Sequence, residues 1–200
     1  MPEWHRSFDE AWRSLETRNE PLGTLAEVLP ADDAHVVRVW LAAVDDGPAA
    51  AMAAVQEQLG RLAWLQLLPR HLLHVTLGRV EGSASDRAAL AGLGPFRLTF
   101  GPVNALHGAV VAEVGGHLDA LRRAVAALAP AVNLDTFLPH ATLAVFWEPA
   151  PPAELRAALE PLRDVALGEQ VVSELLLCDV PGGQGTFGQP WTVVERLSLM

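Results

Sequence analysis

Hydrophobic positions along the chain follow helical spacing in some segments and strand spacing in others. Phe8, Trp12 and Leu15 recur at the spacing of one helix face, and Pro21 and Gly23 then end that helix. The same spacing predicts helices over residues 49–59, 83–93, 116–128 and 153–163, and a short helical turn over 24–29. Strands are predicted over residues 36–44, 72–80, 96–100, 109–114, 137–146, 171–178 and 191–199, where apolar and β-branched residues lie between turn residues.

The order of these elements favours an α+β fold. Strands and helices alternate irregularly, and several strands follow one another as hairpin-like pairs, which indicates mostly antiparallel sheets rather than a doubly wound parallel sheet. Helical spacing dominates residues 1–34, and strand spacing begins at His35. We therefore expect an N-terminal helical appendage, residues 1–34, followed by the main domain, residues 35–200.

Composition narrows the class of protein. Of the 200 residues, 50% are hydrophobic, which is enough for a buried core and too many for a disordered chain. The longest apolar runs fall well short of the roughly 20 residues that span a bilayer. The opening segment MPEWHRSFDE lacks the apolar core of a secretory signal, and Cys178 is the only cysteine, so no internal disulfide can form. We expect a cytoplasmic monomer that does not bind membranes.

The charge of the chain limits its partners. The 14 basic residues are all arginines, and 24 acidic residues bring the net charge to −10. Long nucleic acids require a basic face on the protein. The chain is therefore not expected to bind long nucleic acid, and any phosphate chemistry must be confined to a few groups in a cleft.

One short motif occurs twice, each time in a predicted strand. It is His-Val-Thr-Leu at residues 74–77 and His-Ala-Thr-Leu at residues 140–143. Alternate side chains of a strand share a face, so the histidine and threonine of each copy point the same way and the other two residues point into the core. A single copy would be weak evidence for a site, but two copies in the same register indicate a shared one. The candidate site residues are His74, Thr76, His140 and Thr142.

These four side chains have an obvious use on a phosphodiester. Histidine titrates near neutral pH, so one ring can accept a proton from water or a ribose hydroxyl while the other donates one to the leaving oxygen. The threonine hydroxyls can hold the non-bridging phosphate oxygens between the rings. His71 and His74 do not suggest a metal pair, because residues three apart in a strand point to opposite faces. No metal and no cofactor is expected.

Over residues 35–200 the chain resembles the two-histidine (2H) phosphoesterases. Among them it is similar to the bacterial 2′-5′ RNA ligase-like proteins, which open 2′,3′-cyclic phosphates. The likeness rests on the strand HVVRVWLAAV, the segment LLHVTLGRV, the run FLPHATLAVF and the ending SELLLCDVPGGQGTFGQPWTVVERLSL. The Phe-x-Pro-His-x-Thr-Leu run is typical of the family's second motif.

The resemblance implies a fold and a set of catalytic residues. The fold would be a bilobal, pseudo-symmetric pair of mostly antiparallel sheets, with helices on the outer faces and a central cleft. His74 and His140 would be the catalytic acid and base, in an order left open, and Thr76 and Thr142 would bind the phosphate. Close relatives often carry a basic residue five positions after the second histidine, where this chain has Val145. Arg79 stands at the equivalent place after the first histidine.

Three further residues are candidates for substrate binding. Arg38 and Trp40 share a face of the first core strand, where Arg38 could bind phosphate and Trp40 could stack on a base. Phe146 continues the face of His140 and Thr142 and could form a second base platform. The alternatives are a solvated arginine, a half-buried tryptophan and a core phenylalanine.

The sequence therefore predicts a metal-independent phosphodiesterase. Its substrate would be a 2′,3′-cyclic phosphate, on an RNA terminus or a small nucleotide, and its product by resemblance a 2′-phosphate. One alternative is a non-catalytic module that binds nucleotides or phosphate in the same cleft. Another is 2′-5′ RNA end-joining, which only the family resemblance implies.

Overall fold

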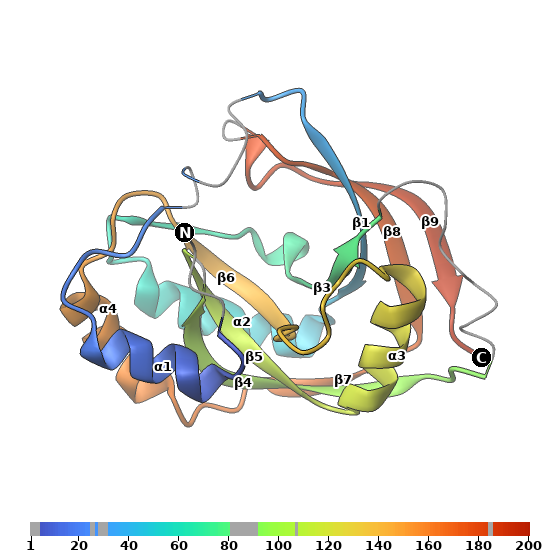
Figure 1. The fold of residues 1–200 in the computed structure, drawn as a ribbon, viewed down its shortest axis with the longest axis horizontal. Coiled ribbons are helices and arrows are strands. Elements are labelled where there is room, and N and C mark those ends of the chain that lie inside the picture. Colours follow the sequence, from blue (N-terminus) through green and yellow to red (C-terminus); the bar gives the residue numbers. More distant parts are fainter. Residues whose placement is uncertain (1–4, 25–26, 28–31, 81–91, 107, 184–185) are drawn as a thin grey trace.

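A computed structural model describes residues 5–24, 27, 32–80, 92–106, 108–183 and 186–200. The helix predicted over residues 83–93 and the turn predicted over 24–29 lie almost entirely outside the described residues. In the described part, one large antiparallel sheet is surrounded by helices (Figure 1). The α+β class predicted from the sequence is confirmed.

The elements fall close to their predicted positions. The helices are α1 (Phe8–Thr17), α2 (Asp46–Leu59), α3 (Leu118–Leu128) and α4 (Pro152–Leu159), with two short 3-10 helices at Arg70–Leu72 and Glu160–Leu162. The strands are β1 (Val36–Ala43), β2 (Leu65–Leu67), β3 (His74–Arg79), β4 (Phe96–Leu106), β5 (Ala109–Gly116), β6 (His140–Phe146), β7 (Gly168–Val172), β8 (Glu174–Pro181) and β9 (Thr192–Ser198). No helix in the described part of the chain is both long and apolar enough to cross a membrane.

The sheet curls until its two edges approach each other. Its strand order is β7-β4-β5-β6-β3-β1-β8-β9, with β2 paired to β6. Only Ser173 separates β7 from β8, yet these strands lie near opposite ends of that order. The ends must therefore meet, and the amide of Leu199 in the tail after β9 donates to Ser173 O at 2.9 Å. The single strand predicted over residues 171–178 is wrong for this reason, because its two parts pair with different neighbours.

Two halves of the sheet join at its centre. The His140 half consists of β7, β4, β5 and β6 with β2, and the His74 half consists of β3, β1, β8 and β9. The halves are connected through β3 and β6, where Val75 pairs antiparallel with Ala141. The bilobal pair of sheets predicted from the resemblance is therefore one continuous sheet with two similar halves.

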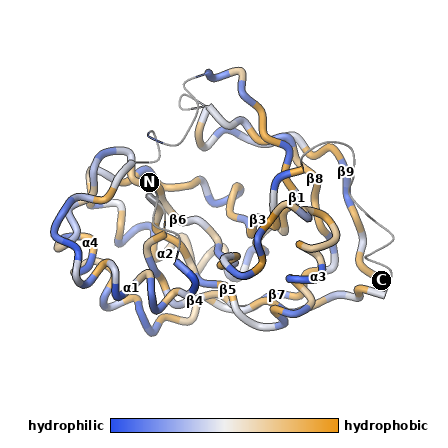
Figure 2. The backbone as a smooth tube through the Cα atoms, in the orientation of Figure 1, coloured by the Kyte–Doolittle hydropathy of each residue, from blue (hydrophilic) through white to orange (hydrophobic). Residues whose placement is uncertain are grey.

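Helices α2, α3 and α4 cover one face of the sheet and form the main core with it. The core cluster contains Met52 of α2, Leu121 of α3 and Leu155 of α4. It also contains Val75 and Ala141 from the two central strands. The buried amide of Gln56 crosses this core, because its Nε2 donates at 2.7 Å to both Leu68 O and Leu143 O. Figure 2 shows the hydrophobic residues concentrated on the strands, whereas α1 is mostly hydrophilic.

Helix α1 contacts the His140 half from two sides: its Leu15 belongs to the main core cluster, whereas its Ala11 lies in a small cluster on the other face of the sheet. Ser7 begins the helix as its N-cap, since Ser7 Oγ accepts from Glu10 N at 3.1 Å. Ala11, which is 3% exposed, packs against Leu106 and Val111 of β4 and β5. The segment after α1 is also attached to the domain, because Leu22 forms an isolated antiparallel bridge with Ala150. The part of the predicted appendage that contains α1 and Leu22 is thus packed against the main domain.

Candidate active site

The two His-x-Thr-Leu motifs meet where β3 and β6 pair. Their pairing runs through Val75 and Ala141, whose side chains enter the main core. Continuing the antiparallel register by one residue in each direction sets His74 across from Thr142 and Thr76 across from His140. Because side chains alternate along a strand, all four lie on the face opposite the core, called the catalytic face below.

Each histidine is held in the same way. His74 Nδ1 lies 2.7 Å from Leu72 O, and His140 Nδ1 lies 2.7 Å from Leu138 O. A carbonyl oxygen can only accept a hydrogen bond, so Nδ1 carries the proton in both rings. Nε2 of each neutral ring is then left as a hydrogen-bond acceptor that can take a proton.

Burial makes both rings harder to protonate. It lowers the pKa of His140 below the ordinary histidine value of 6.5, against the smaller effect of the Leu138 carbonyl. Burial also lowers the pKa of His74, and the charge of a protonated His140 lowers it further. A positive charge on one ring therefore opposes a positive charge on the other.

An apolar cluster adjoins His74. The Trp191 ring meets the His74 ring edge to face, with centroids 5.0 Å apart and planes at 86°. Leu41 pairs with Thr76, so the same face continues from β3 across β1 and β8. We call this cluster the apolar face; it consists of the buried residues Val39, Leu41, Leu176 and Cys178 and the partly buried residues Val37, Val180, Trp191 and Val193.

A polar network adjoins His140. Glu113 of β5 pairs with His140 and so lies on the same face. Its Oε1 accepts from Asn104 Nδ2 at 3.0 Å and from Arg163 Nη1 at 2.6 Å. Both charged side chains are mostly buried, and Arg163 also lies 4.8 Å from the centre of the Trp12 ring. Neither Glu113 nor Arg163 is predicted from the sequence, because the strand register that joins them is not readable from the chain.

Both motif strands contain a β-bulge just after the threonine. In β3 the pairing with β1 skips Leu77, and in β6 the pairing with β5 skips Leu143. An extra residue reverses the alternation of side chains beyond it. The fifth position after each histidine therefore returns to the catalytic face. Arg79 is exposed there in the His74 half, whereas Val145 is buried in the other.

The bulge in β6 corrects the prediction for Phe146. Unbroken alternation would keep Phe146 on the face of His140, but the bulge turns it into the core. There it is fully buried and packs edge to face on Trp64, with ring centroids 5.7 Å apart. Phe146 fills the core and cannot contact a substrate.

The predictions for Arg38 and Trp40 are also corrected. The two residues share a face of β1 as predicted, but Leu41 pairs with Thr76, so that face is the one turned away from the histidines. Trp40 is 0% exposed and belongs to the main core. Arg38 forms two hydrogen bonds with Asp179, at 2.7 and 2.8 Å, which raise the pKa of the guanidinium and lower that of the carboxyl.

The lone thiol does not contribute reactive chemistry. Cys178 lies within the apolar face, and burial raises its pKa to about 11. Among the described residues, no group of three or more His, Cys, Asp and Glu side chains lies together as metal ligands would.

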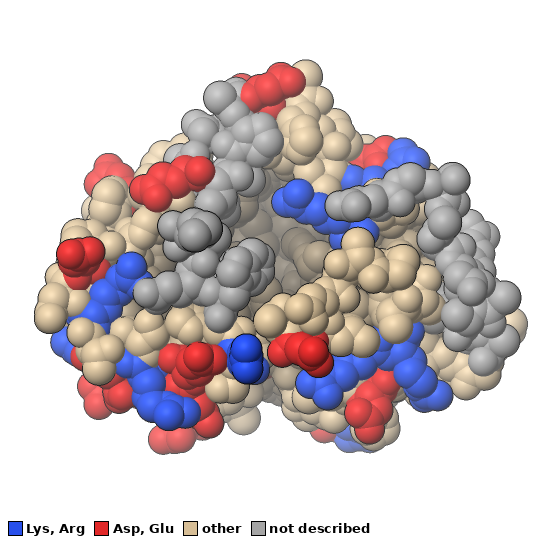
Figure 3. Space-filling model, in the orientation of Figure 1, with Lys and Arg blue, Asp and Glu red and all other residues tan. Residues whose placement is uncertain are grey.

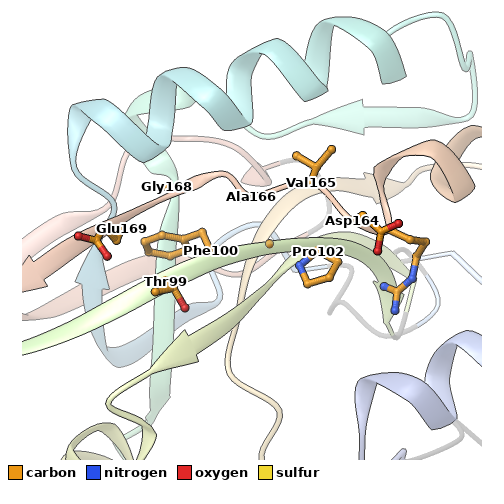
Figure 4. Close-up of a pocket in the computed structure, with 10 residues that line it drawn as sticks. Thr99, Phe100, Pro102, Asp164, Val165, Ala166, Gly168 and Glu169 are labelled. Carbon is orange, nitrogen blue, oxygen red and sulfur yellow. The ribbon is translucent and has the colours of Figure 1, made fainter.

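The molecule has a central recess and a separate cavity in its surface. The space-filling view has a recess near its middle, with arginine side chains at its edge (Figure 3). A separate open cavity of about 560 Å³ lies at the opposite edge of the His140 half, between β4 and the segment before β7 (Figure 4). It contains neither histidine, although Arg163, which pairs with Glu113 beside His140, is one of its lining residues. Its lining includes Thr99, Phe100, Pro102, Asp164, Val165 and Glu169.

Several solved structures have a similar fold. TT0787 of Thermus thermophilus is 20% identical, with a TM-score of 0.56, over 82% of this chain and 97% of that one. E. coli LigT complexed with phosphate is 17% identical, with a TM-score of 0.56, over 82% of this chain and 98% of that one. The conserved protein of unknown function ATU0111 from Agrobacterium tumefaciens is 13% identical, with a TM-score of 0.55, over 96% of this chain and 99% of that one.

The likeness lies in the fold rather than in the sequence. No model of a protein family matches the chain, and no curated protein matches it. Alignments to LigT leave out 18% of this chain, whereas the alignment to ATU0111 leaves out 4%. The chain has the fold of E. coli LigT and TT0787, as its two His-x-Thr-Leu strands and their flanking segments predicted.

Proposed function

We propose that the protein is a metal-independent phosphodiesterase that hydrolyses 2′,3′-cyclic phosphates to 2′-phosphates. The observation that carries this proposal is the matched pair of histidines on one face of the sheet. Each has its Nδ1 proton bound to a backbone carbonyl at 2.7 Å and its Nε2 left available, with a threonine beside it.

The hydrolysis requires one base and one acid. Nε2 of the neutral ring removes a proton from water as the water oxygen bonds to phosphorus. Nε2–H of the protonated ring donates its proton to the ribose O3′ as the bond between phosphorus and O3′ breaks. The product is a 2′-phosphomonoester with a free 3′ hydroxyl, and the proton has in effect passed from one ring to the other.

The pKa shifts of the two histidines support the assignment of one ring as acid and the other as base. Burial opposes protonation of both rings, and a charge on His140 opposes protonation of His74. Once one ring is protonated, the other stays neutral over a range of pH. The pair can therefore present an acid and a base together.

The threonines and the phosphate complete the arrangement. A hydroxyl hydrogen bond to an anionic oxygen is stronger than one between neutral groups, so Thr76 and Thr142 would hold the non-bridging oxygens. Structures of E. coli LigT complexed with phosphate and with 3′-AMP, at TM-scores of 0.56 and 0.54 to this chain, support a nucleotide phosphate as the ligand.

A substrate screen tests the proposal. Cyclic mononucleotides, RNA fragments ending in a 2′,3′-cyclic phosphate and 2′-5′-linked dinucleotides would be incubated with the protein, and the products separated by chromatography. We expect 2′-phosphate products from a cyclic phosphate, unchanged by EDTA and absent with the double variant His74→Ala and His140→Ala. Activity in the double variant, or loss of activity with EDTA, would overturn the mechanism.

The buried Val145 favours a second candidate, a binding module without catalysis. Val145 is 2% exposed and takes the place on the catalytic face that Arg79 occupies in the other half. The His140 half therefore offers no cation at that position. Calorimetry with a cyclic nucleotide distinguishes the two functions, because a module would bind the nucleotide and leave it intact.

A further inference from the structure

The two ends of the candidate site differ in charge. Because β3 and β6 run antiparallel, His74 and His140 lie at opposite ends of the four-residue site. Strand β3 begins at His74, so it runs past His140 and continues to Arg79. Strand β6 begins at His140, so it runs past His74 and continues to Val145. A cation therefore lies beyond the His140 end, and a valine lies beyond the His74 end.

Arg79 lies on the catalytic face, a short distance beyond the His140 end. It pairs with Val39 of β1, whereas Thr76 pairs with Leu41, so Arg79 and Thr76 are two β1 residues apart in the register. A strand rises about 3.3 Å per residue, which sets the Arg79 backbone about 7 Å beyond that of Thr76. The Arg79 side chain is exposed, and it forms no ion pair with another described residue. Its charge is therefore available to a substrate on that face.

The position beyond His74 offers no charge. Val145 is 2% exposed, and its neighbours across the sheet are Ala109 of β5 and Gln66 of β2. Since neither neighbour is charged, an anionic group attached to the substrate is attracted to the Arg79 end of the site and not to the Val145 end. The difference in charge can thus orient the substrate along the line between the two histidines.

The orientation of the substrate decides which histidine is the acid. In the hydrolysis of a 2′,3′-cyclic phosphate, water attacks phosphorus on the side opposite the leaving O3′. The base therefore lies on the water side of the phosphorus, and the acid lies on the ribose side, beside O3′. The ribose also carries, at its 5′ carbon, the phosphate of a nucleotide or the phosphodiester that continues an RNA chain.

We propose, on the basis of the proposed function, that Arg79 binds the phosphate group at the 5′ carbon and thereby places the ribose at the His140 end. His140 Nε2–H then donates its proton to O3′ as the bond between phosphorus and O3′ breaks. His74 Nε2 takes a proton from the water whose oxygen bonds to phosphorus. The pKa shifts agree with this order, because the charge of a protonated His140 lowers the pKa of His74 and so favours the neutral form of that ring.

The first test varies the charge at the 5′ carbon. One substrate is a nucleoside 2′,3′-cyclic phosphate with a free 5′ hydroxyl, the second carries a 5′-phosphate, and the third is a dinucleotide that carries a phosphodiester there. For the wild type we expect kcat/KM to favour one or both of the substrates with a 5′ phosphate group by at least about tenfold. The better of these two identifies a nucleotide or an RNA end as the source of that group. Equal values for all three substrates would overturn the inference.

Variants then assign the preference to Arg79. Arg79→Gln removes the charge and should reduce the preference to about threefold or less, whereas Arg79→Lys keeps the charge and should retain most of it. Arg61→Gln changes an exposed arginine that follows α2 and should leave the preference unchanged. If Arg79→Gln lowers kcat/KM equally for all three substrates, or leaves the preference as it is, Arg79 does not bind the 5′ group.

The second test identifies the acid through the leaving group. Sulfur in place of O3′ gives a thiolate leaving group, which needs no proton because a thiol has a pKa of about 8.5, far below that of an alcohol. On this substrate His140→Ala should come within about tenfold of the wild type, whereas His74→Ala should remain at least about 100-fold impaired. The opposite pattern, or equal impairment of the two variants, would overturn the assignment. Glutamine replaces alanine at either position if the alanine variant does not fold.

Binding separates this inference from the proposed function. If the wild type hydrolyses no cyclic phosphate, the proposed function and the assignment of acid and base fail together, and calorimetry tests Arg79 alone. The two ligands are a nucleoside 2′-phosphate and the same compound with a 5′-phosphate. Tighter binding of the bisphosphate, reduced by Arg79→Gln, would support the role of Arg79, and equal affinity for both ligands would overturn it.

Discussion

The two halves of the sheet place the same motif on the catalytic face, but in different surroundings. Both contain a histidine held at Nδ1 by a carbonyl two residues earlier, a threonine beside it and a β-bulge at the following leucine. Beside His74 lie the side chains of the apolar face, whereas beside His140 lies the network of Glu113, Asn104 and Arg163. The backbone geometry around each histidine is thus the same in both halves, whereas the side chains that surround each histidine differ.

This difference separates two requirements that a paired site has to meet. Orientation of the rings depends on hydrogen bonds within three residues of each histidine, which the two halves reproduce. Access to the rings depends on what covers each half, and only the His140 half is covered by α1 among the described residues. The two halves can therefore share one chemistry in unequal surroundings, and making the same change in both halves tests this.

Removing either imidazole should have the largest effect. His74→Ala and His140→Ala should each lower kcat by about 10²–10⁴-fold, the usual contribution of a general acid or base, because neither ring can do both tasks. Steady-state assays on a cyclic mononucleotide measure the effect, and circular dichroism checks that the variants fold. A loss confined to one of the two variants would contradict the shared mechanism.

Removing a threonine hydroxyl should have a smaller and similar effect in both halves. Thr76→Val and Thr142→Val keep the shape of the side chain and delete one hydrogen bond to the phosphate. A hydrogen bond to a charged group contributes about 1.5–3 kcal/mol, so kcat/KM should fall by about 10–150-fold. If only one threonine matters, the phosphate is held from one strand and the symmetry of the site is lost.

The fourth position after each histidine distinguishes the halves by packing. A Cβ on Gly78 would lie 2.4 Å from Ala129 Cβ and 2.6 Å from Val132 Cγ2, beside the end of α3. Gly78→Ala should therefore lower the free energy of unfolding by about 1–3 kcal/mol. Its counterpart Ala144 already fits, and Ala144→Gly should cost only about 1 kcal/mol. Denaturant titrations of both variants check this, and equal losses would contradict the difference in packing.

Titration should reveal the smallest difference between the halves. The pKa of each histidine lies below 6.5 in the folded protein, so the unfolded chain binds more protons just below that pH. The two histidines therefore lower the free energy of unfolding as the pH falls.

The pH profile of kcat/KM should accordingly centre below pH 6.5. Replacing His140 with Asn should raise the pKa of His74, because the repelling charge is gone; NMR titration measures it. No change in His74 would mean that the rings do not interact.

The predictions from sequence succeed where the structure depends on neighbours along the chain. Helical spacing located α1 through Phe8, Trp12 and Leu15, and strand alternation brought His74 and Thr76 onto one face. Alternation also sent Val75 and Ala141 to the core, where both are fully buried. The α+β class follows from the same local patterns.

The predictions fail where a partner strand decides the outcome. The bulge at Leu143 turns Phe146 inward, and the carbonyl of Leu143 accepts a hydrogen bond from Gln56 of α2, a residue far away in the sequence. The pairing of Leu41 with Thr76 selects which face of β1 meets the site, so Arg38 and Trp40 face away from it. The break at Ser173 exists because β7 and β8 pair at opposite ends of the sheet order.

The sequence by itself determined the four polar side chains of the candidate site, their shared face and the absence of lysine that limits its partners. The tertiary structure decided what surrounds them: α1 beside His140, Trp191 against His74, and the buried pair of Glu113 and Arg163. The physical reason is the range of each interaction. Side-chain alternation is fixed by backbone geometry within a few residues, whereas register, bulges and helix docking depend on free energies shared between segments far apart in the chain.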